Sequence, residues 1–218
     1  MIELIAPHHY MEFVETLSDM HRLRYRVFKE RLKWDVKCRD GMEFDEFDDR
    51  NPVYLLSRSD DKVQGCVRLL PTTGPTMLCQ VFSHLLDGKP PPQSPAIWES
   101  SRFALDLPRA VERRDRGLAM ATFELFAGMI EFGISRQLCH IVTVTDVRIE
   151  RILHRADWPL TRLGSAQKIG DTLAVAGSLE VSIAALNRVR NACHIRTRML
   201  WAPVEFPAKP EMTFGTGL

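Results

Sequence analysis

A short run that sets an acid and a base among apolar residues most constrains how this chain can fold. The run is Trp98-Glu99-Ser100-Ser101-Arg102-Phe103, and flanking prolines bound it at the length of one strand. In a regular strand Glu99 and Arg102 point to opposite faces. A bulge at Ser100-Ser101 would bring both side chains to one face, and bulges often lie beside active sites. Taken alone, the run is most simply a strand with a structural Glu–Arg ion pair.

Length and composition describe an ordinary globular protein. With 218 residues, 45% hydrophobic and 26% charged, the chain can bury a sizeable core, and we expect one domain over residues 1–218. The net charge of +1 gives no reason to expect nucleic acid as a partner. No apolar run approaches the ~18 residues of a membrane span, and residues 1–5 do not resemble a signal peptide. We therefore expect a cytoplasmic protein.

The reactive side chains form no metal or dinucleotide motif. The five cysteines are scattered without a CxxC pair, which indicates reduced thiols and argues against a zinc site or a disulfide framework. The seven histidines form no HExxH motif, and the sequence has neither a P-loop nor a GxGxxG motif. We expect no metal and no prosthetic group.

Hydrophobic patterning predicts a mixed α/β domain. Strands before and after a long amphipathic helix form a βαβ unit, so these two strands should run parallel. With a hairpin before them, the sheet is mixed and the fold is α+β or an α/β sandwich. Residues 77–86 are of uncertain type. The predicted helices are 10–31, a segment from about 118 and 178–191, and the predicted strands are 53–58, 63–70, 98–105 and 140–145.

Two segments have features that indicate a ligand. Residues 33–50 mix acidic side chains with Trp34, Phe44 and Phe47, and because exposed aromatics are costly we expect this loop to fold over a site. The junction Arg114-Asp115-Arg116-Gly117-Leu118-Ala119 places arginines and a glycine at a helix start, where backbone N–H groups and the dipole favour a phosphate. A solvated basic helix start is the simpler alternative for the second segment.

Charged and aromatic residues also follow one another in a characteristic order between Arg24 and Arg102. The set is Arg24, Phe28, Trp34, Gly41-Met42-Glu43, Asp45-Glu46-Phe47-Asp48, Arg68 and Glu99-Ser100-Ser101-Arg102-Phe103. In order and spacing it resembles the acyl-homoserine-lactone synthases, the bacterial autoinducer synthases of quorum sensing. The resemblance extends from about residue 2 to about residue 160 and is weaker beyond.

This resemblance implies a GNAT-like three-layer sandwich with a mixed central sheet and a V-shaped gap between the parallel strands at 98–105 and 140–145. It implies an acyltransferase that joins an acyl group from acyl-CoA or an acyl carrier protein to S-adenosylmethionine. The same enzyme would then close the lactone and release 5′-methylthioadenosine. The arm of the acyl donor would lie in the gap and bind like an added strand.

Within this resemblance, Glu99 is the predicted general base. The α-amino group of the substrate has a pKa of about 8 and must be neutral to attack a thioester, and a carboxylate beside it can take the proton. We expect Trp98, Phe103 and the covering loop to tune the pKa of Glu99 by desolvation. Backbone amides at the bulge could stabilise the oxyanion.

The remaining charged residues are assigned to ion pairs or to the substrate. Arg24 and Arg102 suit a carboxylate or the acidic set, because a guanidinium pairs bidentately. Asp45 and Asp48 can hold an ammonium, ribose hydroxyls or those arginines, or can simply fix the loop. Arg68 lies in mid-strand, where pairing with an acidic residue is an alternative to a substrate contact.

Aromatic and apolar residues are assigned to the two substrates. Trp34 and Phe28 could face the sulfonium through a cation–π contact, although Phe28 equally fits the core. By family position Thr143 lies where a hydroxyl can bond a 3-oxo group, but a β-branched strand residue explains it equally well. The candidates for the acyl pocket are Ser101, Phe103, Leu125, Phe126, Met129, Thr143 and Val144.

The choice of donor and the alternative function stay open. The pattern Arg114-x-x-Gly117-x-Ala119 resembles the pyrophosphate loop of CoA-using GNAT enzymes, while the same arginines could dock an acidic carrier protein. The alternative function is a GNAT-type N-acyltransferase with another amine acceptor, which would not need the residues from Arg24 to Asp48. A catalytically silent binding protein of this fold would tolerate loss of Glu99.

Overall fold

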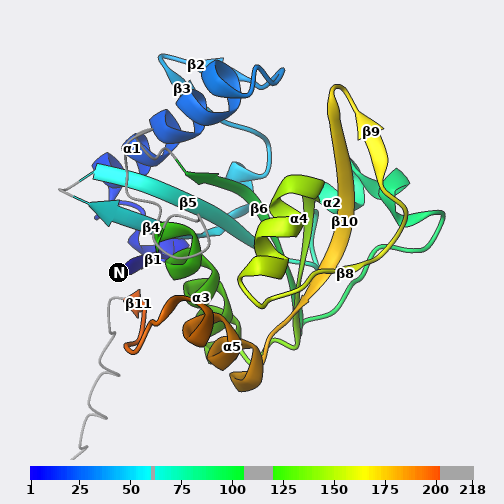
Figure 1. The fold of residues 1–218 in the computed structure, drawn as a ribbon. Helices are drawn as coiled ribbons and strands as arrows, with labels where there is room; N and C mark the ends of the chain where they lie inside the picture. Colours follow the sequence, from blue (N-terminus) through cyan, green and yellow to red (C-terminus); the bar gives the residue numbers. More distant parts are fainter. Residues whose placement is uncertain (60–61, 106–119, 202–218) are drawn as a thin grey trace, which may run out of the picture.

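The computed structural model describes residues 1–59, 62–105 and 120–201. These residues form one nine-stranded mixed sheet in the order β11-β1-β4-β5-β6-β7-β10-β8, with β9 paired to β10 (Figure 1). The strands are β1 (Ile2–Ile5), β4 (Val53–Ser59), β5 (Lys62–Pro71), β6 (Ile97–Leu105), β7 (His140–Asp146), β8 (Thr161–Arg162), β9 (Gln167–Ile169), β10 (Thr172–Glu180) and β11 (Leu200–Trp201). A two-residue ribbon, β2 (Cys38–Arg39) and β3 (Met42–Glu43), is separate from this sheet.

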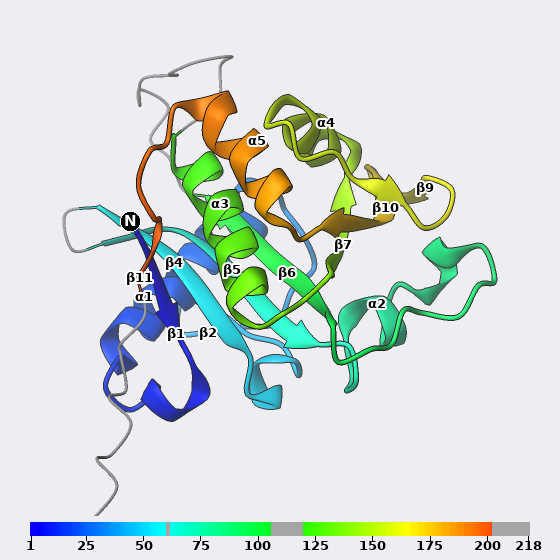
Figure 2. The same cartoon turned by 90° about the horizontal axis from the view of Figure 1, so that it is seen from below.

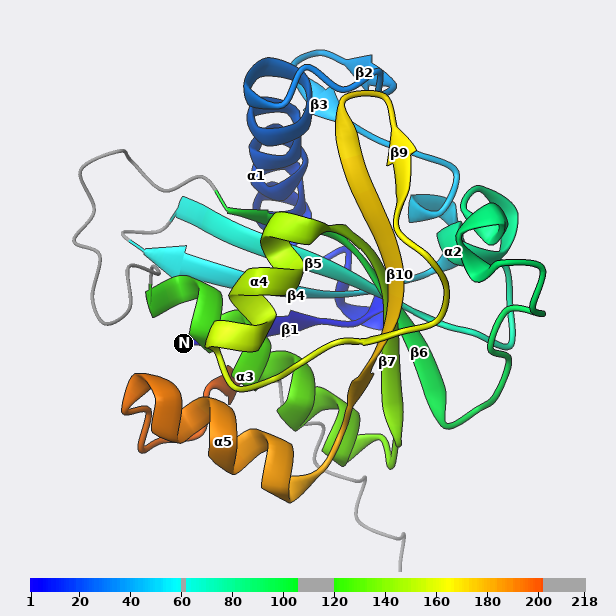
Figure 3. The ribbon, with the colours of Figure 1, turned by 45° about the vertical axis from the view of Figure 1, so that its right-hand side comes forward.

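Helices cover both faces of the sheet and complete a three-layer sandwich. Figure 2 looks onto α3 and α5, with α1 beyond the sheet, and Figure 3 shows α4 near β7 and β10. The longer helices are α1 (Val14–Arg24), which continues as the π-helical turn η2 (Tyr25–Arg31), α3 (Met120–Ser135), α4 (Val147–Arg155) and α5 (Ile183–Cys193). The short ones are η1 (Pro7–His9), η3 (Asp48–Arg50), α2 (Met77–Gln80) and η4 (Ser83–Leu86).

The predicted architecture is confirmed in its main parts. The hairpin is β4 and β5, and β6 and β7 on either side of α3 run parallel. The stretch 77–86, of uncertain type in the sequence, forms the two short helices α2 and η4. The predicted helix at 178–191 is wrong at its start, because β10 stays paired to β7 as far as Glu180 and the Ser182 side chain then caps α5.

The sheet opens between β6 and β7, as predicted. The two strands pair at four positions that end at Ser100 and Thr143, where the Thr143 hydroxyl donates a 3.0 Å hydrogen bond to the Ser100 carbonyl. Beyond this point β6 continues to Leu105 paired with β5, and β7 continues to Asp146 paired with β10. The diverging ends form a V-shaped gap that begins at the Ser100–Thr143 pair.

A bulge in β6 determines which side chains face the site. Arg68 of β5 pairs with Ser101, but Cys66 pairs with Ala104, so β6 carries one extra residue between those pairs. Arg102 lies there in the left-handed region with φ of +53°. The bulge is therefore near the predicted Ser100-Ser101 pair but just beyond it. As predicted, Glu99 and Arg102 lie on one face of the sheet, the face toward α1 and α2.

Candidate active site

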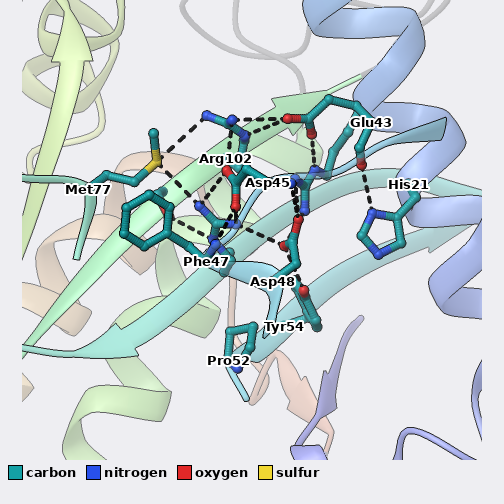
Figure 4. A network of polar contacts seen from close by, with 12 residues as sticks. His21, Glu43, Asp45, Phe47, Asp48, Pro52, Tyr54, Met77 and Arg102 are labelled. Atoms are coloured by element: carbon teal, nitrogen blue, oxygen red, sulfur yellow. Dashed lines mark hydrogen bonds and ion pairs between the residues drawn. The ribbon is translucent and has the colours of Figure 1, made fainter. Parts of the chain in front are cut away.

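Three arginines and three acidic residues form an ion-pair network on the α1 face of the sheet (Figure 4). The acids lie on residues 43–48, here called the acidic segment, which runs from β3 into η3. The arginines come from three elements far apart in sequence, α1, β5 and β6. The members are Arg24, Arg68, Arg102, Glu43, Asp45 and Asp48.

Arg24 ends α1 on the face that packs against the sheet, and it is fully buried. Its Nη1 and Nη2 donate to the two oxygens of Asp48 at 2.8 and 2.9 Å, and its Nε donates to Glu43 Oε2 at 2.5 Å. The Arg24 guanidinium thus joins both ends of the acidic segment to the helix, Asp48 through the bidentate pair and Glu43 through Nε. A guanidinium without solvent contact is tolerated here because every edge of it meets a carboxylate.

Arg68 lies at the centre of the network and is also fully buried. Its Nη1 donates to Asp45 and, at 2.8 Å, to Asp48, while its Nη2 donates to the other oxygen of Asp45 at 3.0 Å. Its Nε donates to the Ser101 hydroxyl at 3.1 Å, and its Nη2 also lies 3.3 Å from Met77 Sδ. The alternative prediction for Arg68, pairing with acids, is therefore what the structure has.

Arg102 is the network arginine with unused donor capacity. Its Nε donates to Glu43 Oε1 at 3.0 Å, and its Nη2 lies 2.7 Å from Asp45 Oδ2. Among the described residues, the partner of Nη1 is the Met77 thioether at 3.6 Å, and a thioether is a weak acceptor. Arg102 is also the most exposed of the three, with 12% of its side chain accessible. One edge of this guanidinium is therefore available to an anionic ligand.

Two aromatic rings extend from Arg102 toward solvent. Its guanidinium carbon lies 5.5 Å from the centre of the Phe28 ring, and Phe28 stacks on Trp34 at 5.1 Å and 11°. Phe28 is buried, whereas Trp34 is 39% exposed. Phe28 is therefore part of the core, as one of its two predictions has it, and its ring also contacts the network arginine Arg102.

The aspartates, by contrast, have no free acceptor capacity. Asp48 accepts from Arg24 twice, from Arg68, from the Tyr54 hydroxyl and from the Asp45 backbone, against about four lone-pair sites on a carboxylate. Burial acts to raise the pKa of Asp48, but the charges of Arg24 and Arg68 outweigh it and hold that pKa well below the usual range. Asp48 therefore binds the arginines rather than a ligand.

Glu99 lies beside the network in a different environment. It is 1% exposed, and its two oxygens accept from the backbone N–H groups of Met77 and Leu78 at 2.9 and 2.7 Å. Burial raises the pKa of Glu99, and these backbone donors lower it only in part. Met77 thus contacts Glu99 through its backbone and both Arg68 and Arg102 through its sulfur.

The predicted source of this desolvation is wrong in part. Trp98 and Phe103 lie on the opposite face of β6, where Trp98 packs edge-on against Phe132 and Phe103 contacts Phe126. Trp98 points away from Glu99 because adjacent strand residues alternate in face. For Phe103 the cause is the bulge, which adds Arg102 to the face of Glu99 and leaves Phe103 on the face toward α3. Residues of α2 cover Glu99 instead.

The predicted acyl-pocket residues fall into two groups. Phe103, Phe126 and Met129 belong to the core between the sheet and α3, together with Leu125. Val144 packs with the cluster under α2 and η4, and Ser101 faces Arg68. Thr143 lies at the start of the V-shaped gap. Arg114 and Gly117 lie outside the described residues.

Sequence reasoning missed three residues that contact the network. Met77 lay in a stretch without clear periodicity. His21 precedes Arg24 by one helical turn, so its position on the same face of α1 was readable, but its partner, the Glu43 carbonyl, was not. Tyr54 reads as an ordinary strand residue, and only the fold brings its hydroxyl to Asp48.

Comparison with known proteins identifies the family. The autoinducer synthase family model matches residues 8–189. The chain belongs to the autoinducer synthase family. An acyl-homoserine-lactone synthase of Agrobacterium fabrum is 46% identical over 187 residues, which cover 85% of this chain and 88% of the relative.

Solved structures of autoinducer synthases have the same fold. The crystal structure of the acyl-homoserine-lactone synthase LasI aligns with a TM-score of 0.77 and 36% identity, over 89% of this chain and 94% of LasI. The CoA-dependent synthase BjaI, solved with S-adenosylmethionine and isopentyl-CoA, aligns with a TM-score of 0.83 and 26% identity over 95% of each chain. Among the described helices of this autoinducer synthase, none has the length and apolarity needed to cross a membrane.

Proposed function

We propose that this autoinducer synthase is an acyl-homoserine-lactone synthase that binds S-adenosylmethionine against the ion-pair network and uses Glu99 as its base. The observation that carries the proposal is the juxtaposition at Met77. A buried carboxylate with a raised pKa and a guanidinium with a free edge both contact this one residue. A zwitterionic amino acid needs such a pair, an acceptor for its amine and a donor for its carboxylate.

The substrate's charges match the sides of the site. The free edge of Arg102 suits the α-carboxylate, and the exposed face of the Trp34–Phe28 stack suits the sulfonium through a cation–π contact of about 1 kcal/mol or more when desolvated. The saturated acids, Asp45 and Asp48, act indirectly by fixing Arg68 and Arg102. The division between residues that contact the substrate and residues that hold the arginines follows from the free acceptor capacity of each carboxylate.

Glu99 takes the first proton. The amine of S-adenosylmethionine loses a proton to Glu99, directly or through one water, and its nitrogen attacks the thioester carbon. The carbon–sulfur bond of the thioester breaks, the nitrogen gives up a second proton as the amide forms, and the sulfur takes up a proton so that the donor leaves as a thiol. The substrate's own carboxylate oxygen then attacks Cγ, the Cγ–S bond breaks, and 5′-methylthioadenosine leaves as the lactone closes. This second step asks the protein mainly for positioning.

The V-shaped gap is the proposed place of the donor's arm. Between Ser101 and Leu105 the edge of β6 that faces β7 has no strand partner in the described register, so an extended arm can add to it as a strand would. Phe103, Phe126 and Met129 lie on the α3 side of this gap and would contact the acyl chain. Thr143 marks its closed end.

The test is a product assay on the purified full chain. S-adenosylmethionine is incubated with a panel of acyl-CoA and acyl-carrier-protein donors, straight, branched and aryl, and products are measured by mass spectrometry. An N-acyl-homoserine lactone together with methylthioadenosine supports the proposal, and the productive donor defines carrier and acyl class. Thiol release with another amine, without methylthioadenosine from any donor, would instead support a general N-acyltransferase.

Two further properties belong to this proposal. One sheet runs through the described residues, which supports a single domain. All five cysteines are free, and reduced thiols are typical of the cytoplasm, which supports a cytoplasmic site of action.

A further inference from the structure

Two aromatic residues contact the acidic segment at the end of the network opposite Met77 (Figure 4). His21 of α1 is 9% exposed, and its Nδ1 lies 2.8 Å from the carbonyl oxygen of Glu43. Because a carbonyl only accepts, Nδ1 carries the proton in this bond. The imidazole also stacks on Phe44, with ring centres 4.0 Å apart. His21 thus holds the backbone at the start of the acidic segment.

Tyr54 of β4 holds the other end. It is 3% exposed, and its hydroxyl donates a 2.8 Å hydrogen bond to Asp48 Oδ1. Its ring meets the His21 ring edge-on, with centres 6.4 Å apart and an interplanar angle of 76°. The two residues therefore contact each other and the first and last carboxylate-bearing residues of the acidic segment.

The acidic segment needs such support. It has little regular structure of its own, since β3 ends at Glu43 and η3 begins only at Asp48. The three of its four carboxylates that belong to the network nevertheless determine where Arg68 and Arg102 point. A guanidinium aimed slightly wrongly loses a bidentate contact. Flexible acidic side chains cannot fix a long arginine unless their own backbone is fixed.

We infer that His21 and Tyr54 are positioning residues that clamp the acidic segment and thereby aim Arg102 at the carboxylate of S-adenosylmethionine. The inference rests on the proposed binding of this substrate at the network. Neither residue contacts Glu99 or Met77, and neither lies in the V-shaped gap where the acyl donor is proposed to bind. Their loss should therefore weaken binding of S-adenosylmethionine and leave use of the acyl donor unchanged.

The first test is Tyr54→Phe with Tyr10→Phe as its matched control. Both changes delete one phenol hydroxyl, but Tyr10 donates to the Pro52 carbonyl and not to the network. Loss of a hydrogen bond to a buried carboxylate predicts about a tenfold higher Kd for S-adenosylmethionine in calorimetry with no acyl donor present. The KM for S-adenosylmethionine should rise by a similar factor, with an unchanged KM for the donor. Tyr10→Phe should leave both constants unchanged.

The second test separates the hydrogen bond of His21 from its stacking. His21→Phe keeps a ring against Phe44 but loses the donor, whereas His21→Asn places an amide N–H close to the position of Nδ1 and loses the ring. The inference predicts weaker S-adenosylmethionine binding in His21→Phe and recovery of most of that loss in His21→Asn. Thermal unfolding of each variant confirms that the protein measured is folded.

The outcomes separate the clamp from the proposed substrate site. If the wild-type chain binds S-adenosylmethionine but Tyr54→Phe and His21→Phe bind it no differently, or lose affinity for both substrates equally, the clamp is wrong and the substrate site stands. If Arg102→Lys binds S-adenosylmethionine as tightly as the wild type, the proposed site itself is wrong.

Discussion

At the scale of single residues, hydrogen-bond capacity distinguishes structural charges from those available to a ligand. Asp48 has more donors than lone-pair sites, and Asp45 accepts from Arg68 at both oxygens. Glu99 and one edge of the Arg102 guanidinium, by contrast, keep hydrogen-bonding capacity for a ligand. The sequence predicted that Glu99 and Arg102 act together, because both stand in one apolar strand. It could not predict that both aspartates are saturated, since that depends on donors from distant elements.

Asp48→Asn should therefore be strongly destabilising. The change removes an anion from between two buried guanidiniums, and breaking a buried ion pair costs roughly 3 kcal/mol or more. Because Asp48 has a folded-state pKa below its ordinary 3.8, this stabilisation is present above that pH and is lost as the pH falls further. Urea unfolding measures the loss, and Asp49→Asn at the exposed neighbour should change stability by less than about 0.5 kcal/mol.

The pH dependence of turnover reports on Glu99. Burial raises its pKa above the ordinary 4.5, and only the ionised form accepts a proton from the substrate. We expect kcat/KM for the acyl donor, at saturating S-adenosylmethionine, to fall on the acid side with an apparent pKa above 4.5. An acid limb centred at or below 4.5 would contradict the buried-base assignment.

At the scale of elements, the bulge in β6 links the fold to the site. The sequence suggested a bulge because a bulge would bring an acid and a base three residues apart to one face of the strand. Its exact position was not readable, since Arg102 carries no local signal for a left-handed backbone. The π-helical turn at the end of α1, which carries Phe28, had no readable signal either. Both features lie at tertiary contacts, since Arg102 pairs with Glu43 and Asp45 and the π-helical turn packs against β3 and β6.

A pair of substitutions tests the left-handed backbone at Arg102. Arg102→Gly and Arg102→Ala both remove the side chain and its ion pairs. In an ordinary strand glycine is the less stable of the two, but a left-handed position costs alanine about 1 kcal/mol or more. The glycine variant should therefore be the more stable in chemical denaturation. A more stable alanine variant would rule out the bulge geometry described here.

At the scale of the whole molecule, the end of the described chain returns to the first strand. Ile2 donates to the Met199 carbonyl at 2.8 Å, and β11 runs parallel to β1. Glu131 of α3 accepts from the backbone of Met199 and Leu200 and pairs with Arg190 of α5. The strand–helix–strand pattern was enough to predict the fold class. This return was not predictable, because two residues of β11 carry no periodicity.

Glu131→Ala should loosen this closure. Two buried N–H groups and a guanidinium would lose their acceptor, and we expect a loss of roughly 2 to 3 kcal/mol in unfolding free energy. Within the described residues, Glu124→Ala on the same helix removes an ion pair with the exposed N-terminal amine, and it should cost less than about 0.5 kcal/mol. Equal stability of the two variants would show that β11 adds little to the fold.

The most direct test of the central claim compares lactone formation by the wild type and Glu99→Gln. Glutamine keeps the size of the side chain and can still accept one backbone hydrogen bond, but it cannot take a proton at neutral pH. The account predicts that the variant binds S-adenosylmethionine in calorimetry, yet forms lactone and methylthioadenosine at least about a hundredfold more slowly. Undiminished formation of both products by a folded Glu99→Gln variant would contradict the assignment of Glu99 as the base.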